Sequence, residues 1–344
     1  MKQLYGYNDE VSHEWTDGVL AVKFRNFAKA EDPNRKWLIF DGPVDAVWIE
    51  NMNTVLDDNK KLCLNSGEII AMSKSMNLIF EPMDLQAASP ATVSRCGMVY
   101  LEPKSMGWRI LLDSWINTLP EHFTEDDRKH IYSLVDWVAE HLMDFIRANV
   151  EEISPTQDQN LVKSLMKLYS CLLKEFENKD FYLSYSDTKL RTSIFEAKFI
   201  FSLVWSFGGS ADTNHRKKIE SEIKRVLSGD VKFEQYEKRK LSYPERNTLF
   251  DYNHAAKAAG QEATAYEWVL WTEYINLNEK IPKNILPQEI IVKTNDSVRY
   301  SKILGITIAN EIPILFCGPT GTGKSIYIKN YILNDLPSTE YMSI

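Results

Sequence analysis

One glycine-rich stretch near the carboxyl end restricts the possible folds more than any other feature of this chain. Residues 314–325 have the sequence ILFCGPTGTGKS, which fits the pattern G-x-x-x-x-G-K-[ST] without a gap. The apolar run Ile312 to Cys317 predicts a strand before the loop, and the pattern from Ile326 to Leu333 predicts a helix after it. A strand, a glycine-rich loop and a helix in this order are the context that a phosphate-binding loop requires.

The residue types of this loop suit a nucleotide triphosphate. Glycines let the backbone wrap a phosphate chain with its N–H groups pointing inward, and the start of the next helix adds its positive dipole end. Lys324 would reach the outer phosphates, and the Ser325 hydroxyl would ligate Mg²⁺. The alternative is a glycine-rich turn that binds nothing. The predicted nucleotide-binding residues are Gly318, Pro319, Thr320, Gly321, Thr322, Gly323, Lys324 and Ser325.

The position of the loop in the chain makes a further prediction. Ser325 is followed by 19 residues, up to Ile344. A P-loop NTPase also needs a second strand with an acidic residue for the metal shell, and groups that orient the attacking water. These parts do not fit into 19 residues, so we expect this loop to be half of a site. The chain alone should then show no ATPase activity.

Composition limits the class of protein. The 344 residues are 44% apolar and 12% aromatic, which is typical of a globular chain with room for two domains. A net charge of −8 argues against a general nucleic-acid surface or an anionic-membrane surface. The longest apolar run, about Phe199 to Phe207, is far too short for a membrane helix, and the polar start does not resemble a signal peptide. The four scattered cysteines are typical of reduced thiols in a cytosolic protein.

A second candidate for phosphate chemistry lies near the amino end. Residues 37–41, WLIFD, have the form of a buried parallel strand that presents the Asp41 carboxylate at its carboxyl end. In a nucleotide-binding sheet such a carboxylate holds the Mg²⁺ shell, although apolar runs followed by Asp are also common at ordinary strand ends. The next position is Gly42, where a glutamate would orient water. A site built on Asp41 should therefore bind nucleotide without hydrolysing it.

The remaining pattern divides the chain into three stretches. The first contains a helix through Phe27, a helical stripe and a hairpin, two more core strands, and a short turn or helix that ends at Arg95. The second is helical, and the third contains one more strand and a helix capped by Thr294. The predicted ranges are 45–58 for the stripe, 61–64 with 68–71 for the hairpin, 77–81 and 98–101 for the strands, 107–118, 126–149, 159–177, 188–206 and 214–227 for the helices, and 267–271 and 294–309 for the last two elements.

Two features of the helical stretch, its histidines and a segment rich in charged residues, could have a function. His122, His130 and His141 are too irregularly spaced for a metal site, and we expect them at the surface. The segment His215 to Lys240 is rich in Lys, Arg and Glu. It could be an interaction face, but a solvated helix with ion pairs four residues apart is the simpler interpretation.

Taken together, these segments resemble dynein heavy chains. Residues 37–45 (WLIFDGPVD), 55–60 (VLDDNK) and 91–99 (ATVSRCGMV) are similar to the second AAA+ module of the dynein motor. Residues 201–209 (FSLVWSFGG) resemble the helical lid of that module, and 314–325 resemble the P-loop that opens the third module. The likeness is nearer to axonemal dyneins, particularly the inner-arm type, than to cytoplasmic ones.

The resemblance implies roles for single residues. Asp41 matches the Walker B aspartate of the second module, and Gly42 fits a module that holds ATP without turning it over. Arg95 matches an arginine finger that reaches the nucleotide of the first module; the alternative is a salt bridge within its own module. An arginine suits a finger because it is always charged and bidentate toward phosphate oxygens. Where many AAA+ proteins have a polar sensor, this chain has Glu81 to Asp84, and no sensor can be assigned.

The resemblance also implies an architecture and a biological role. The predicted fold class is α/β, with AAA+ P-loop NTPase modules and an all-helical lid. The predicted domains are 1–104, the end of the second large domain; 105–242, its lid; and 243–344, the start of the third large domain with its Walker A loop. Expected cofactors are ATP or ADP and Mg²⁺. Because Asp41 and Ser325 belong to different modules, they should not share one ion.

A dynein segment of this kind implies partners and a location. They are the adjacent AAA+ modules of the same heavy chain and, through other regions, microtubules and dynein subunits, with no nucleic acid and no membrane. The location would be the cytoplasm and cytoskeleton, in the axoneme of a cilium or flagellum, and the function minus-end-directed movement along microtubules. Two alternatives are a stand-alone regulatory nucleotide-binding protein and a permuted GTPase, although the chain has no base-selective N-K-x-D sequence.

Overall fold

The computed structural model describes residues 2–102, 106–236, 238–257, 265–275 and 292–337. The chain forms two compact units, residues 1–101 and 102–344. The described helices include none that is long and apolar enough to cross a membrane.

The first unit is built around a pair of parallel strands, β3 (Lys36–Asp41) and β6 (Met76–Glu81), which pair in register from end to end. Helix α2 (Val19–Lys29) buries Leu20, Ala21 and Phe24 in the same core. The antiparallel hairpin of β4 (Lys61–Cys63) and β5 (Ile69–Ala71) confirms the predicted hairpin. The other short elements are α1 (Lys2–Tyr5), β1 (Gly6–Asn8), β2 (Trp15–Asp17), α3 (Ala46–Glu50), α4 (Asn53–Leu56) and α5 (Pro90–Val93).

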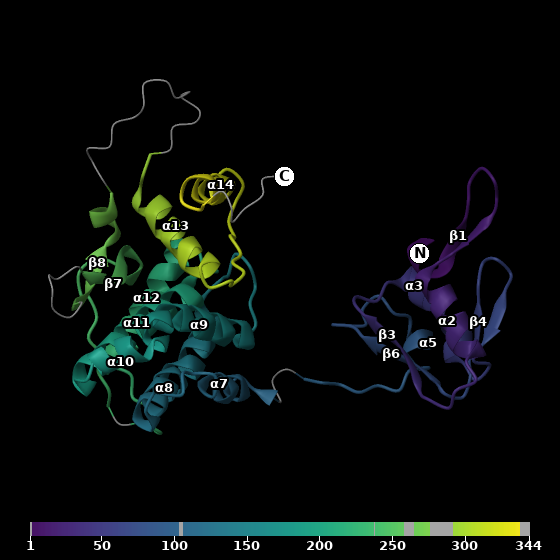
Figure 1. Cartoon of the computed structure of the whole chain (residues 1–344), viewed down its shortest axis with the longest axis horizontal. Helices are drawn as coiled ribbons and strands as arrows, with labels where there is room; N and C mark the ends of the chain where they lie inside the picture. Colours follow the sequence, from purple (N-terminus) through teal and green to yellow (C-terminus); the bar gives the residue numbers. More distant parts are fainter. Residues whose placement is uncertain (1, 103–105, 237, 258–264, 276–291, 338–344) are drawn as a thin grey trace, which may run out of the picture. The chain divides into compact units, whose positions relative to one another are not determined.

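The second unit is dominated by helices whose apolar faces close around one core (Figure 1). Helix α11 (Thr188–Gly208) is buried on nearly all sides from Ala197 onward, which makes it the central element. Helix α8 (Glu125–Asn149) begins at a capping box in which Thr124 and Asp127 satisfy each other's backbone N–H groups. The remaining helices of the bundle are α7 (Arg109–Ile116), α9 (Asp158–Leu173), η1 (Lys174–Glu177), α10 (Lys179–Ser184) and α12 (Thr213–Leu227).

A third group of elements packs against this bundle. Strands β7 (Tyr252–Lys257) and β8 (Ala265–Leu270) form an antiparallel pair between two short turns, η2 (Leu249–Asp251) and η3 (Trp271–Tyr274). Trp271 is fully buried, and its indole N–H donates to the Phe250 carbonyl at 2.8 Å. Helix α13 (Asn295–Ile308) contributes Ile303 to the core of the bundle, and α14 (Lys324–Asn334) packs on α13 (Figure 1).

Several predicted elements differ from the observed ones. The stripe at 45–58 forms two short helices, because α3 ends at Glu50 and α4 begins at Asn53. The stretch between the predicted helices 159–177 and 188–206 is not a simple break, because it contains α10, whose first turn is capped by the Asn178 side chain. Strand β7 was not predicted.

Two predicted strands, 98–101 and 312–317, are extended chain without strand pairing, so those predictions were wrong for this structure. A β-strand needs a hydrogen-bonded neighbour, and the described residues supply none beside either segment. Both segments leave large apolar side chains exposed, such as Val99 and Leu315.

Candidate functional site

The glycine-rich loop has the backbone conformation of a phosphate cradle. Gly321 and Gly323 have φ of +83° and +82°, in the left-handed region that residues with a Cβ rarely adopt. Gly323 is the N-cap of α14, so the loop leads directly into the positive end of an 11-residue helix. The backbone therefore has the left-handed glycines and the helix start that such a loop requires, and phosphate binding by these residues stays a prediction.

Lys324 folds back over the loop. Its ammonium donates to the carbonyls of Gly318 and Pro319 at 2.8 and 2.5 Å, and lies 3.4 Å from the Thr322 hydroxyl. Ser325 is exposed on the first turn of α14. A cation on a long side chain above the loop and an exposed hydroxyl beside it fit a phosphate chain with a bound metal ion. Lys324 would then exchange its carbonyl partners for phosphate oxygens.

The two helices around the loop are joined by a close approach. A Cβ on Gly305 of α13 would lie only 2.7 Å from the Tyr331 hydroxyl of α14, so a larger residue here would require the Tyr331 ring to shift. The start of α13 is fixed by the Thr294 hydroxyl, which accepts the Ser297 N–H at 3.2 Å, as the predicted cap requires. The P-loop helix is thus held against a well-capped neighbour.

Asp41 lies at the carboxyl end of the parallel strand β3, as predicted, and is exposed. The strand itself is not buried as expected, because Trp37 and Ile39 are 55% and 56% exposed. In the parallel register its partner is Glu81 at the end of β6. The sequence identified no sensor in this segment, and the structure places a second carboxylate level with Asp41. Gly42 faces open space, since a Cβ built there meets no atom within 4 Å. Asp41 and Ser325 lie in different compact units, and the prediction that they do not share an ion stays a prediction.

Arg95 makes the salt bridge that is the alternative to a finger role. Its Nε donates to Asp57 Oδ1 at 2.5 Å, and its Nη1 donates to the Ala91 carbonyl at 2.7 Å. The hydrogen bond to Asp57 raises the pKa of Arg95 above its ordinary value. Thr92 of α5, the short helix that ends just before Arg95, is buried. Its hydroxyl donates to Asn53 of α4 at 3.0 Å, so a second contact joins this segment to α4. Sequence reasoning noticed Asp57 only as part of a motif and missed this pairing.

No metal site of protein ligands occurs among the described residues, since they contain no group of three His, Cys, Asp or Glu side chains that could hold an ion.

The histidines of the helical stretch, His122, His130 and His141, are half-buried, so their expected surface position was wrong. His122 Nε2 lies 2.9 Å from the Phe176 carbonyl, and His130 and His141 face Glu196 and Glu222 at 3.3 and 2.7 Å. These partners are in neighbouring helices, a tertiary arrangement that sequence spacing does not reveal.

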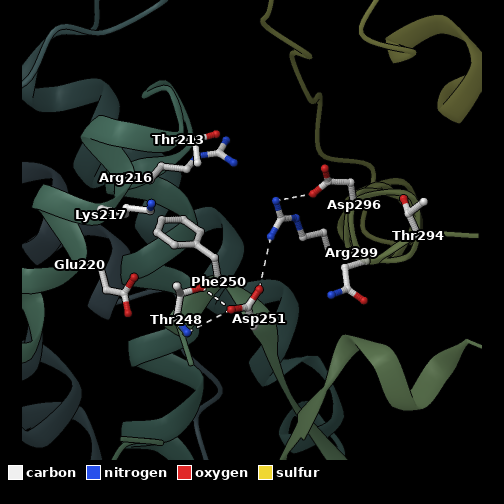
Figure 2. A pocket seen from close by; sticks show the side chains of 11 residues that line it. Thr213, Arg216, Lys217, Glu220, Thr248, Phe250, Asp251, Thr294, Asp296 and Arg299 are labelled. Carbon is white, nitrogen blue, oxygen red and sulfur yellow. Dashed lines mark hydrogen bonds and ion pairs between the residues drawn. The ribbon is translucent and has the colours of Figure 1, made fainter. Parts of the chain in front are cut away.

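A cavity of about 400 Å³ lies between α12, η2 and the start of α13 (Figure 2). Among its charged groups, one arginine pairs with two carboxylates of the lining, and one glutamate pairs with a lysine outside it. Arg299 faces Asp296 and Asp251, and Glu220 pairs with Lys224 at 2.8 Å. The mixed charges give no single sign of potential, so the cavity does not indicate a particular ligand.

Comparison with known proteins decides what this arrangement belongs to. Residues 131–273 match the family model described as dynein heavy chain AAA lid domain, and residues 279–344 match the one described as P-loop containing dynein motor region. Dynein axonemal heavy chain 3 of Homo sapiens is 43% identical over 352 residues, covering 99% of this chain. The chain belongs to the dynein heavy chain family.

Other axonemal dynein heavy chains also match over nearly the whole of this chain. Dynein axonemal heavy chain 12 of Mus musculus is 42% identical over 99% of this chain, and dynein axonemal heavy chain 1 of Mus musculus is 41% identical over 100%. This chain spans 8% of heavy chains 3 and 1, and 11% of heavy chain 12. It therefore corresponds to a small segment of these dyneins.

The family match confirms the predicted fold class. The chain is α/β, with AAA+ P-loop architecture, a partial parallel sheet with helices, and a dynein lid built on a helical bundle. The residues matched by the lid model, 131–273, also include the antiparallel pair β7–β8. A P-loop dynein motor region implies nucleotide binding. The observed divisions are the two units, which separate after Leu101, and the lid match that runs to residue 273. The predicted boundaries at 104/105 and 242/243 stay predictions.

Proposed function

We propose that this chain is the part of a dynein motor ring that leads from the second AAA+ module into the third. In this role it binds ATP or ADP, with Mg²⁺, at residues 318–325. The observation that carries the proposal is the loop geometry: left-handed glycines, Lys324 above the loop and Ser325 exposed at the start of α14, within a segment that matches a dynein P-loop region.

The chain's own residues would share the work of holding the nucleotide. Backbone N–H groups of the loop and the start of α14 would bind phosphate oxygens, and Lys324 would neutralise the outer phosphates. The Ser325 hydroxyl would hold Mg²⁺, which shields the charge between phosphates. Orientation of an attacking water needs groups that this stretch does not contain, so its role here is binding and coupling.

Asp41 and Arg95 serve neighbouring sites in this proposal. Asp41 is the Walker B carboxylate of the second module, and Gly42 beside it leaves that module without a group to orient water. Arg95 is the finger for the first module; its contact with Asp57 would be exchanged for phosphate oxygens when the modules close. Coupled to the rest of a heavy chain, the segment contributes to minus-end-directed movement on microtubules of an axoneme, in contact with adjacent AAA+ modules.

Titration of the chain with a fluorescent ATP analogue tests the binding proposal. Lys324→Ala should weaken binding at least about tenfold, or about 1.4 kcal/mol, because it removes the charge nearest the outer phosphates. Lys329→Ala, on an exposed position of the same helix, is the matched control and should bind like the unmodified chain. Equal affinity for the Lys324→Ala variant and the control would contradict phosphate binding at this loop.

The finger assignment needs a full-length motor. Arg95→Ala should lower ATP hydrolysis at the first module by about 10³-fold or more, as loss of a finger does in other phosphoryl-transfer enzymes. Its nucleotide affinity at the third module should stay the same. If the variant melts early and keeps its turnover per folded molecule, the Asp57 contact is the whole role of Arg95.

A further inference from the structure

A tyrosine on α13, the helix before the P-loop, connects the lid to residues on both sides of the loop. Tyr300 lies half-buried on α13, and its hydroxyl accepts a hydrogen bond from Nη1 of Arg216 at 3.0 Å. Arg216 belongs to α12, so this bond joins the segment matched by the lid model to the segment matched by the P-loop model.

Arg216 is itself held firmly. Its Nε donates to the Gly208 carbonyl at 3.0 Å and its Nη2 to the Gly209 carbonyl at 3.2 Å, at the end of the central helix α11. The guanidinium also lies 5.3 Å from the centre of the Phe250 ring, a distance suited to a cation–π contact. Figure 2 shows Arg216 and Phe250 on one side of the cavity and Arg299 of α13 on the other. Arg216 therefore presents a fixed donor to Tyr300.

The ring of Tyr300 contacts both sides of the P-loop. Its centroid lies 6.4 Å from that of Phe316, two residues before Gly318, and 6.1 Å from that of Tyr327 in the first turn of α14. Tyr327 in turn lies against the loop, since a Cβ on Gly323 would be 3.5 Å from its ring. On the lid side, the Trp205 ring packs edge-on against Tyr300 at 6.1 Å.

The contacts of Tyr300 are important for the position of the loop because residues 312–317 have no neighbouring strand in the part of the chain that the structure describes. Among the described residues, the ring contacts to Phe316 and Tyr327 come from Tyr300 of α13. Tyr300 contacts the residues that flank the loop on both ends, whereas the Tyr331–Gly305 contact lies further along α14.

We infer that Tyr300 is a positioning residue: oriented by Arg216 of the lid, it sets the place of Phe316 and Tyr327, and with them the phosphate-binding loop. The affinity of the loop for nucleotide then depends on the lid that precedes it. This consequence rests on the proposed nucleotide binding, whereas the mechanical connection itself does not.

Hydrogen–deuterium exchange on the 344-residue chain tests the connection without nucleotide. Tyr300→Phe keeps the ring and loses only the hydroxyl. We expect amides in 316–330 to exchange at least about threefold faster, with α8 and α9 unchanged. Tyr274→Phe is the matched control, because it also loses one hydroxyl contact, from Asn253 at 3.0 Å, in the same unit. Unchanged exchange at 316–330 in Tyr300→Phe would overturn the inference.

A double-mutant cycle separates positioning from general packing. Arg216→Lys removes the hydrogen bond to Tyr300 together with those to the Gly208 and Gly209 carbonyls, and it should give the same faster exchange at 316–330. Adding Tyr300→Phe to it should give little more there, since the bond between the two side chains is already lost. Additive effects, or faster exchange spread over α8 and α9, would mean that Tyr300 only stabilises the fold.

Titration with a fluorescent ATP analogue then measures the consequence. Tyr300→Phe should weaken binding about two- to fivefold, with the melting temperature unchanged. If the unmodified chain binds no analogue, the proposed function fails, and the exchange experiment still decides the role of Tyr300.

Discussion

The lid bundle and the P-loop segment are both rich in apolar residues, but the two regions differ in how far these side chains are buried. In the bundle, Leu165 and Leu203 are completely buried, whereas Leu315 before the loop is 78% exposed. Helices satisfy their backbone hydrogen bonds internally and need only one another's faces to close a core. A strand must find both its hydrogen bonds and its cover elsewhere. The helices of the lid bundle therefore cover one another, whereas residues 312–317 have no paired strand among the described residues.

The buried charged groups of the lid bundle are also paired with one another. Arg191 and Asp127 form a buried ion pair at 3.2 Å, and Tyr182 donates to the same carboxylate at 2.6 Å. Burial alone would raise the pKa of Asp127, but the hydrogen bonds from Tyr182, Thr124 and Arg191 outweigh it and lower the pKa. A completely paired cluster of this kind contrasts with the open carboxylates of the sheet, Asp41 and Glu81.

The largest effect on stability is expected from a substitution that breaks this cluster. Asp127→Ala should lower the free energy of unfolding by about 3–5 kcal/mol, because it leaves Arg191 buried without its counter-charge. Urea unfolding followed by circular dichroism measures the loss. Glu177→Ala, which removes an exposed pair with Lys174, is the control and should cost no more than about 1 kcal/mol. Similar losses in both variants would refute the special role of the buried cluster.

A matched leucine pair tests the contrast between the two regions directly. Leu203→Ala should cost about 2–5 kcal/mol, since it leaves a cavity in a closed core. The same change at Leu315 should lie within about 0.5 kcal/mol of the unmodified chain, because the side chain is already exposed. A large loss at Leu315 would show that residues 312–317 are covered in solution.

The hairpin that packs on the lid should make stability depend on pH. Burial, and to a lesser extent the charge of Lys198, lowers the pKa of His254 to about 4. The unfolded chain takes up this proton near pH 6.5, so stability should fall as the pH drops from about 6.5 to 4, by up to about 3 kcal/mol. In His254→Gln this part of the slope should disappear. An unaltered slope between these pH values would assign it to other groups.

The smallest effect is expected at the helix cap beside the P-loop. Thr294→Ala removes the acceptor for the Ser297 N–H and should cost about 1 kcal/mol. Thr294→Ser keeps the oxygen and should restore most of the stability in the same unfolding experiment. If both variants lose stability equally, the methyl group of Thr294, rather than its cap, accounts for the effect.

Local patterns predicted much of this molecule. The helices of the lid follow from their apolar periodicity, the start of α13 from Thr294, and the P-loop from its glycines and Lys324. What could not be predicted depends on distant partners. The strands expected at 98–101 and 312–317 have no strand beside them in the described residues, and the half-buried positions of His130 and His141 depend on glutamates far along the chain.

Arg95 shows the same limit at the candidate site. The motif around it suggested a finger, and the structure shows a salt bridge to Asp57 in the same unit. A sequence motif identifies the residue but does not determine which partner its side chain contacts.

Phosphate release from ATP by the purified chain tests the central claim most directly, namely that the P-loop region binds nucleotide as an incomplete half of a site. We expect the chain to bind a fluorescent ATP analogue and to release phosphate no faster than buffer. Turnover above buffer that Lys324→Ala abolishes would mean that this chain holds a complete catalytic site, and the account of two partial modules would be wrong.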